Sequence, residues 1–187
     1  METVGHHSCY RDGGYEFVLE NAPFIAKHNP ETGKKQFLGT GYYFWDDNKE
    51  MALYWGRKHY AGNFYIVECE LCFDDDCLLD LIGVRKHQKY LMQVREKLAK
   101  LFPYTGDKWC LGNFIEFLKY INETDKRYEG IFDFKAVRAV DVKQEAMPKI
   151  YFVEGKKSHT NLNPRYVICL YEINSLILQS KKILDNE

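Results

Sequence analysis

Apolar positions divide the chain into alternating strands and helices. Seven apolar runs are typical of strands, and they lie at residues 4–9, 38–45, 63–73, 78–82, 130–134, 149–153 and 166–171. Apolar residues at helical spacing predict a long helix at 87–102 and a second one at 109–122. Shorter helical segments are expected at 15–20 and between 47 and 62, and a helical turn followed by a charged end is expected from residue 174.

The order of these elements predicts one α+β domain over residues 1–187, with a central helical insertion between two sets of strands. Asp47, followed three residues later by Glu50, has the pattern of a capping box and is expected to begin the helix that ends near residue 62. The strand at 38–45 contains Gly39 and Gly41. Because interior glycines weaken a strand, this pair indicates close approach by a ligand or another backbone.

Charge is balanced overall but unevenly distributed along the chain. The formal net charge is −1, so no general positive field attracts nucleic acid or an anionic membrane. Residues 74–76 are acidic, whereas 85–108 are rich in lysine and arginine. The basic stretch has two interpretations, a solvated helix face or a surface that binds a polyanion.

The N-terminus, the apolar runs and the cysteines indicate the cellular compartment of the protein. The N-terminus has no basic start followed by an apolar run, so no secretory signal is expected, and no segment approaches the roughly 20 apolar residues of a membrane span. We therefore expect a cytoplasmic protein with reduced thiols and no membrane partner. Cys69 and Cys72 are three residues apart on a strand, where they face opposite sides, so no metal site is expected.

The stretch from residue 37 to 54 contains the main candidate chemistry. Tyr43 and Tyr54 lie eleven residues apart, on either side of a strand-to-helix corner. Two aromatic faces at such a corner could enclose a flat, cationic nicotinamide ring, with a gain of roughly 0.5–2 kcal/mol for each face. The Gly-His-His-Ser run at 5–8 lies upstream and adds a histidine that could hold ribose hydroxyls.

These motifs resemble those of the ADP-ribosyltransferase fold, in its diphtheria-toxin-like, poly(ADP-ribose)-polymerase-like branch. The resemblance lies in the Gly-Thr-Gly-Tyr-Tyr-Phe run at 39–44 and the Met-Ala-Leu-Tyr run at 51–54, and it covers most of residues 4–178. It implies split sheets, mixed and antiparallel, that form a cleft for NAD as co-substrate.

The resemblance also implies the residues that bind NAD. The family histidine corresponds to His6 or to His7, and Ser8 takes the place of the family glycine if His7 is that histidine. The other implied binding residues are Gly41, Tyr43, Met51 and Tyr54.

The third motif, at 162–169, resembles the family strand that begins with the catalytic glutamate. Arg165 stands at the position of that glutamate, and an arginine cannot accept hydrogen bonds. Glu172 lies seven residues further on, so on a regular strand it faces away from Arg165. Glu154, in the preceding loop, is the more plausible catalytic carboxylate, and Arg165 could pair with the NAD pyrophosphate or with an anionic acceptor.

The function that the resemblance implies is NAD-dependent mono-ADP-ribosylation of a macromolecule, either a protein or a nucleic acid. The lack of a secretory signal fits an intracellular toxin or phage-defence effector, with an antitoxin or immunity protein as a further partner. Two alternatives remain open. One is a non-catalytic module that binds NAD or ADP-ribose, and the other is an NAD glycohydrolase that uses water as the acceptor.

Overall fold

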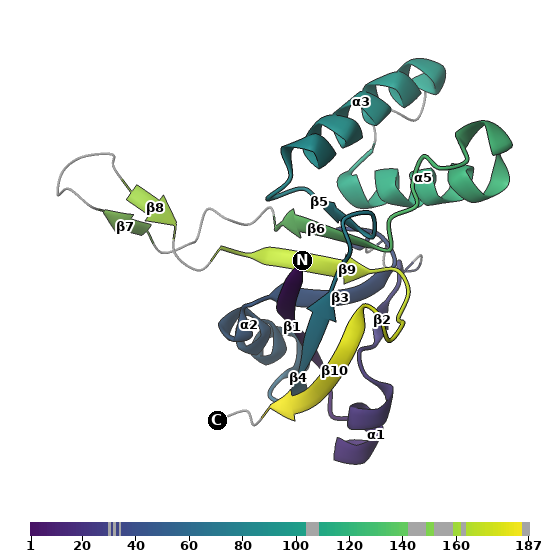
Figure 1. Cartoon of the computed structure of the whole chain (residues 1–187). Coiled ribbons are helices and arrows are strands. Elements are labelled where there is room, and N and C mark those ends of the chain that lie inside the picture. The colour runs from purple at the N-terminus through teal and green to yellow at the C-terminus, as the bar shows by residue number, and fades with distance from the viewer. Residues whose placement is uncertain are drawn as a thin grey trace.

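The computed structural model describes residues 1–29, 31, 33, 35–103, 109–141, 149–151, 159–161 and 164–184. They form an α+β fold around a mixed eight-stranded sheet with the order β10-β4-β1-β3-β9-β6-β5, and β2 pairs with β3 beside this path (Figure 1). The strands are β1 (Glu2–Tyr10), β2 (Ile25–Ala26), β3 (Gly41–Asp46), β4 (Phe64–Cys72), β5 (Leu78–Asp80), β6 (Ala136–Val140), β9 (Tyr166–Leu170) and β10 (Leu178–Leu184). A second sheet pairs β7 (Lys149–Tyr151) with β8 (His159–Asn161).

The helices are α1 (Gly14–Asn21), α2 (Lys49–Tyr60), α3 (Arg85–Leu101) and α5 (Leu111–Thr124), with a short 3-10 helix η1 (Lys126–Tyr128). The connection between β5 and β6, the one parallel pair in the main sheet as described, contains α3 and α5 (Figure 1). This connection is the helical insertion that the sequence predicts. None of the described helices is long and apolar enough to cross a membrane.

Two apolar cores lie on opposite faces of the sheet, because successive strand residues point to opposite sides. Val167 and Cys169 of β9 pack in one core with residues of α2, α3 and α5. Ile168 and Leu170, the alternate residues of the same strand, pack in the other core with Val18 of α1. The strand β9 is therefore buried on both faces, which explains its continuous apolar sequence.

The sheet divides between β1 and β3. β1 pairs with β4 from Glu2 to Tyr10, but it pairs with β3 only through Gly5–Asp46 and His6–Trp45. Beyond that point the first half of β3 pairs with β2 instead. The two central strands thus separate after His6 within one continuous sheet, and the α+β class with a mixed sheet is as predicted.

Four sequence predictions about local structure are wrong. Residues 130–134, predicted as a strand, form turns and an irregular segment. The segment starts at Gly130 with φ +80°, and its phenylalanine rings pack into the core from this loop. The segment after residue 174 forms strand β10 rather than a helical turn with a charged end, and its charged residues fit a strand at the edge of the described sheet, next to β4. The predicted strand at 38–45 begins only at Gly41. Asn48, not Asp47, caps α2, since its side chain accepts a hydrogen bond from the backbone N–H of Met51.

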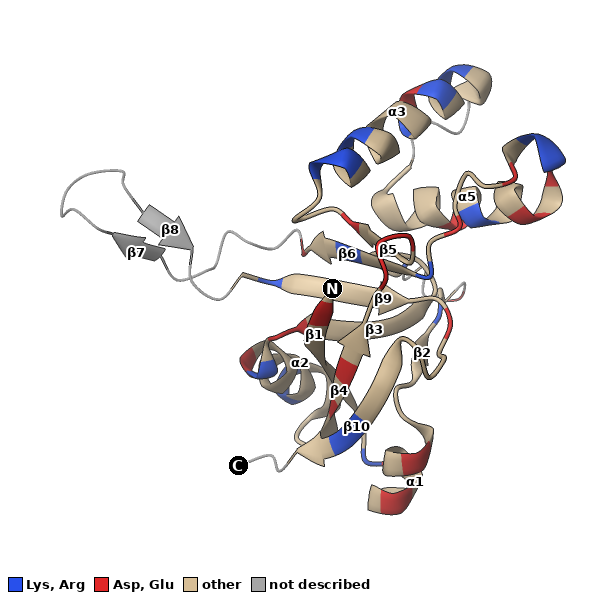
Figure 2. Cartoon of the chain, in the orientation of Figure 1, with Lys and Arg blue, Asp and Glu red and all other residues tan. Residues whose placement is uncertain are grey.

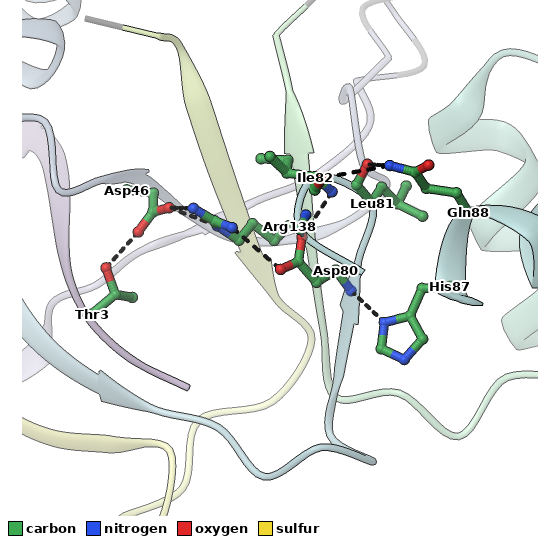
Figure 3. Close-up of polar contacts among 9 residues, drawn as sticks. Thr3, Asp46, Asp80, Leu81, Ile82, His87, Gln88 and Arg138 are labelled. Atoms are coloured by element: carbon green, nitrogen blue, oxygen red, sulfur yellow. Dashed lines mark hydrogen bonds and ion pairs between the residues drawn. The ribbon is translucent and has the colours of Figure 1, made fainter. Parts of the chain in front are cut away.

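A buried ionic network connects three strands across the sheet (Figure 3). Arg138 of β6 donates to Asp46 Oδ2 from Nε at 2.7 Å and contacts the same oxygen through Nη2 at 2.6 Å. Its Nη1 donates to Asp80 Oδ2 at 3.2 Å. Thr3 Oγ donates to the other oxygen of Asp46, and the backbone N–H groups of residues 82 and 83 donate to the other oxygen of Asp80. One guanidinium on β6 therefore compensates two buried carboxylates, Asp80 of the neighbouring strand β5 and Asp46 of β3, which lies beyond β9.

Candidate functional site

A cavity of about 760 Å³ occupies the region where β1 and β3 separate. Its wall includes residues of β1, β3 and α2, the segments around residues 24–26 and 35–37, and Asp141 and Val167 from the other half of the sheet. Four residues singled out from the sequence line it: His6, His7, Ser8 and Tyr43.

The side chain of His7 connects backbone groups at the point where the sheet divides. Its Nε2 accepts a hydrogen bond from the backbone N–H of Phe24 at 3.1 Å, so Nδ1 carries the proton and donates to the carbonyl oxygen of Tyr43 at 2.9 Å. Burial lowers the pKa of His7 to about 4, and the hydrogen bond to Tyr43 opposes this shift. With both ring nitrogens bonded to backbone, His7 has no ring nitrogen left to hold a ligand.

His6 is held differently and keeps one uncommitted nitrogen. Its Nε2 lies 3.3 Å from Glu68 Oε2, while Lys182 Nζ lies 2.8 Å from Glu68 Oε1. The three residues are in register across β1, β4 and β10. The hydrogen bond from Lys182 lowers the pKa of Glu68, with a smaller contribution from His6. The buried Nδ1 of His6 has no partner among the described residues, so of the two histidines His6 keeps one ring nitrogen uncommitted.

Ser8 connects the cavity wall to helix α2. Its hydroxyl donates to the carbonyl oxygen of Ala52 at 2.7 Å. This bond fixes the helix against β1, and it commits the hydroxyl proton within the protein.

Of the two tyrosines expected to enclose a nicotinamide ring, Tyr43 lines the cavity and Tyr54 does not. The hydroxyl of Tyr43 donates to Gly39 O at 2.7 Å and accepts from Leu38 N at 2.8 Å, which fixes its ring. Burial is the largest of several effects that raise the pKa of this hydroxyl far above its usual range. Tyr54 is half exposed, lies near the Lys58 ammonium and does not line the cavity.

The aromatic wall of the cavity comes instead from Trp45 of β3 and from Trp55, the residue of α2 that follows Tyr54. Their ring centroids are 5.8 Å apart, and the His59 ring lies 4.1 Å from that of Trp55. All three residues line the cavity. Each residue turns a helix by about 100°, so residues 54 and 55 face different directions. Trp55 was missed because the expected spacing pointed to its neighbour.

Two other implied binding residues have structural roles. The side chain of Met51 packs against the core on the α2 side, and Met51 does not line the cavity. Gly41 packs against β9: a Cβ at this position would lie 2.5 Å from both Cys169 Sγ and Leu170 O. The absence of a side chain at Gly41 therefore serves strand packing.

Replacing Gly41 with alanine is expected to lower the free energy of unfolding by about 1–3 kcal/mol, because the added methyl group overlaps β9. Chemical denaturation measures this loss. Adding Cys169→Ala removes one of the two overlaps and should restore part of the stability. A fully stable Gly41→Ala variant would contradict the packing role.

Arg165 lies beside the cavity and brings a carboxylate to it. Its Nη2 is 2.7 Å from Asp141 Oδ2, and its guanidinium lies 5.5 Å from the Trp45 ring centroid. The backbone N–H of Asp141 also donates to Arg165 O at 2.9 Å. Asp141 lines the cavity. Sequence reasoning missed this residue because it follows β6, which was not identified as a strand.

The two glutamates considered from the sequence do not change this arrangement. Glu154 lies outside the described residues. Glu172 pairs with Lys135 at 3.2 Å, beyond the end of β9 that is opposite to Arg165. Asp141 is therefore the carboxylate that the described part of the chain places next to Arg165. Within the same part of the chain, no group of three histidine, cysteine or acidic residues could hold a metal ion.

Comparison of this chain with known proteins found no matching family model, no matching curated protein and no matching solved structure. The class established by the structure is therefore a mixed α+β fold with a divided sheet and a cavity at the division.

Proposed function

We propose that this chain binds NAD in the cavity between β1 and β3 and transfers its ADP-ribose unit to a macromolecule. The observation that carries the proposal is the division of the sheet after the His6–Trp45 pair, with a cavity at that point. The cavity wall combines an imidazole, two indoles and a carboxylate, from His6, Trp45, Trp55 and Asp141.

The size and composition of the cavity suit a dinucleotide. Small-molecule sites commonly have volumes of about 300–1,000 Å³ and mostly apolar walls with a few polar groups, and this cavity has about 760 Å³. The rings of Trp45 and Trp55 offer stacking surface for a planar, cationic nicotinamide. His6, with one ring nitrogen paired to Glu68, supplies the nearby polar group.

In the proposed reaction, the bond between ribose C1 and the nicotinamide nitrogen breaks, and its electron pair leaves with nicotinamide. A nucleophile of the acceptor then forms a bond to C1 and loses its proton. Positive charge develops on the ribose as the first bond breaks, as in glycoside hydrolysis. Asp141 provides the carboxylate that opposes this charge, and Arg165 holds that carboxylate in place through the 2.7 Å ion pair.

One observation favours a second function, the binding of NAD or ADP-ribose without transfer. The ion pair between Arg165 and Asp141 offsets the charge of the carboxylate that the reaction needs. A chain of this kind would retain the cavity and its aromatic wall, and it would release no nicotinamide.

Adjacent residues of α2 provide a sharp test of the binding site. Trp55→Ala is expected to weaken NAD binding at least tenfold in calorimetric titration, because Trp55 lines the cavity. Tyr54→Ala serves as the matched control and should change Kd less than twofold, since Tyr54 does not line the cavity. A larger effect of Tyr54→Ala, or no NAD binding by the unmodified chain, would contradict the proposed site.

The reaction is tested by measuring nicotinamide release and transfer of label from NAD to protein, RNA and DNA fractions. We expect label on a macromolecule and a drop of at least tenfold in rate for Asp141→Asn, with a thermal melt to show that the variant is folded. Nicotinamide release without labelling would indicate a glycohydrolase. Tight NAD binding with no release over hours would indicate the binding module.

A further inference from the structure

Four lysines form a row along α3. Lys86, Lys89, Lys97 and Lys100 are all exposed, and exposed Gln93 lies between the two pairs. With 3.6 residues per turn, these five positions fall within about a quarter of the helix circumference. A rise of 1.5 Å per residue makes the row about 21 Å long. We call these four lysines the lysine row.

The lysine row is not used to hold the fold together. Helix α3 packs on the body of the protein through Val94 and Leu98, which are buried, whereas none of the four lysines forms an ion pair with a described residue. Arg85 and Arg95 add two more cations to the helix, and Glu96 is its one acidic residue. Because the whole chain has a net charge of −1 and α3 is strongly positive, the rest of the chain is negative on balance. Figure 2 shows the cations of α3 in blue.

We propose that the lysine row binds the phosphate backbone of a nucleic acid. A line of four cations about 21 Å long offers one positive charge to each of four phosphates of a nucleic-acid backbone, which carries one negative charge per nucleotide. Lysine ammonium groups suit this partner because they bind phosphates as point charges without reading the sequence.

The same helix is poorly suited to a membrane surface. A helix that lies on a membrane needs an exposed apolar face beside its cations, and the apolar face of α3 is buried in the core. Met92 and Leu101 are its large exposed apolar residues, and their spacing of nine residues places them on opposite sides of the helix.

The position of α3 relates the lysine row to the cavity. The last residue of β5, Asp80, pairs with Arg138 of β6, and α3 begins five residues later. Asp141 follows the same end of β6 and lines the cavity. The lysine row therefore begins near the end of β5 and β6 that is followed by Asp141 (Figure 1). If the proposed transfer reaction is correct, on which this step rests, nucleic acid is the class of acceptor.

Binding is tested without NAD, by fluorescence anisotropy with a labelled 20-nucleotide RNA, the same DNA strand and its duplex. Four phosphate contacts predict that affinity falls about 50-fold for single strands and about 150-fold for duplex between 50 and 200 mM salt. Replacing all four lysines with glutamine should remove most of the binding at 50 mM salt and most of this salt dependence.

The matched control removes four exposed cations from elsewhere, through Lys49→Gln, Arg57→Gln, Lys58→Gln and Lys126→Gln, so that net charge is the same in both variants. We expect the control to retain most of the binding, and thermal melts verify that both variants fold. Equal loss in both variants, or no binding by the unmodified chain, overturns the proposal. Binding to anionic vesicles through the lysine row with no binding to nucleic acid also overturns it.

A second measurement separates this inference from the proposed function. With labelled NAD present, nucleic acid should gain label with the unmodified chain and much less with the lysine-row variant. Lysine-dependent binding of nucleic acid without labelling would leave the binding surface intact, and it would refute nucleic acid as the acceptor. Failure to bind NAD at all would refute the proposed function alone.

Discussion

Replacing Arg138 with methionine is expected to lower the free energy of unfolding by about 3–5 kcal/mol. Arg138 contacts Asp46 at 2.6 Å and Asp80 at 3.2 Å, and both carboxylates are buried. Methionine fills much of the same volume but leaves two buried negative charges without their cation. Such charges are costly because the protein interior solvates them far less well than water does. Denaturation in urea, followed by circular dichroism, measures the loss.

Two variants make this prediction specific. Arg127→Met removes an arginine from the exposed pair with Asp125, and it should change stability by less than about 1 kcal/mol. Combining Arg138→Met with Asp46→Asn and Asp80→Asn removes the uncompensated charges, so it should recover part of the lost stability. A loss below about 1 kcal/mol for Arg138→Met would show that the network contributes little to the fold.

Acidification is expected to destabilise the protein by about 3 kcal/mol through His7 alone. The pKa of this buried imidazole is about 4 in the folded state, against 6.5 for its ordinary value. Between these two pH values the unfolded chain binds a proton that the folded chain does not. The contribution of His7 to stability is therefore complete above about pH 6.5, falls as the pH is lowered toward 4, and does not fall further below that.

The prediction is measured by urea denaturation of the unmodified chain and of His7→Asn at intervals from pH 7.5 to 4.5. Asparagine can still donate to the carbonyl oxygen of Tyr43 but does not titrate. The variant is less stable at neutral pH, and the difference between the two proteins should shrink as the pH falls. Parallel stability profiles, or an NMR titration of His7 with a midpoint above pH 6, would contradict the assignment.

The elements predicted best were those whose sequence pattern reflects one dominant environment. The strand at 63–73 is observed as β4, and the long helix at 87–102 is observed as α3 with a one-sided buried face. The polar strand β10 was missed because it lies at an edge of the sheet, where burial does not impose an apolar alternation. The apolar run at 130–134 was wrongly predicted as a strand, because its aromatic rings are buried although the segment is a loop.

The candidate site was predicted in part. The two histidines, Ser8 and Tyr43 do line one cavity. However, the structure distinguishes His6, with one nitrogen uncommitted, from His7, with both nitrogens bonded to backbone. The sequence alone does not distinguish these two adjacent residues, because both are histidines. Their difference arises because neighbouring positions of a strand face opposite sides of the sheet.

By itself, the sequence determined the α+β class, the helical insertion, the long strands and the concentration of lysine on one helix, because each depends on local periodicity or composition. Only the tertiary structure decided that the sheet divides after His6, that Trp55 rather than Tyr54 lines the cavity, and that Arg165 brings Asp141 to it. Those features depend on pairing between strands that are not neighbours in the sequence, β1 with β3 and β6 with β9, and on the rotation of a helix about its axis. Local sequence patterns specify neither, because both are set by packing against the rest of the chain.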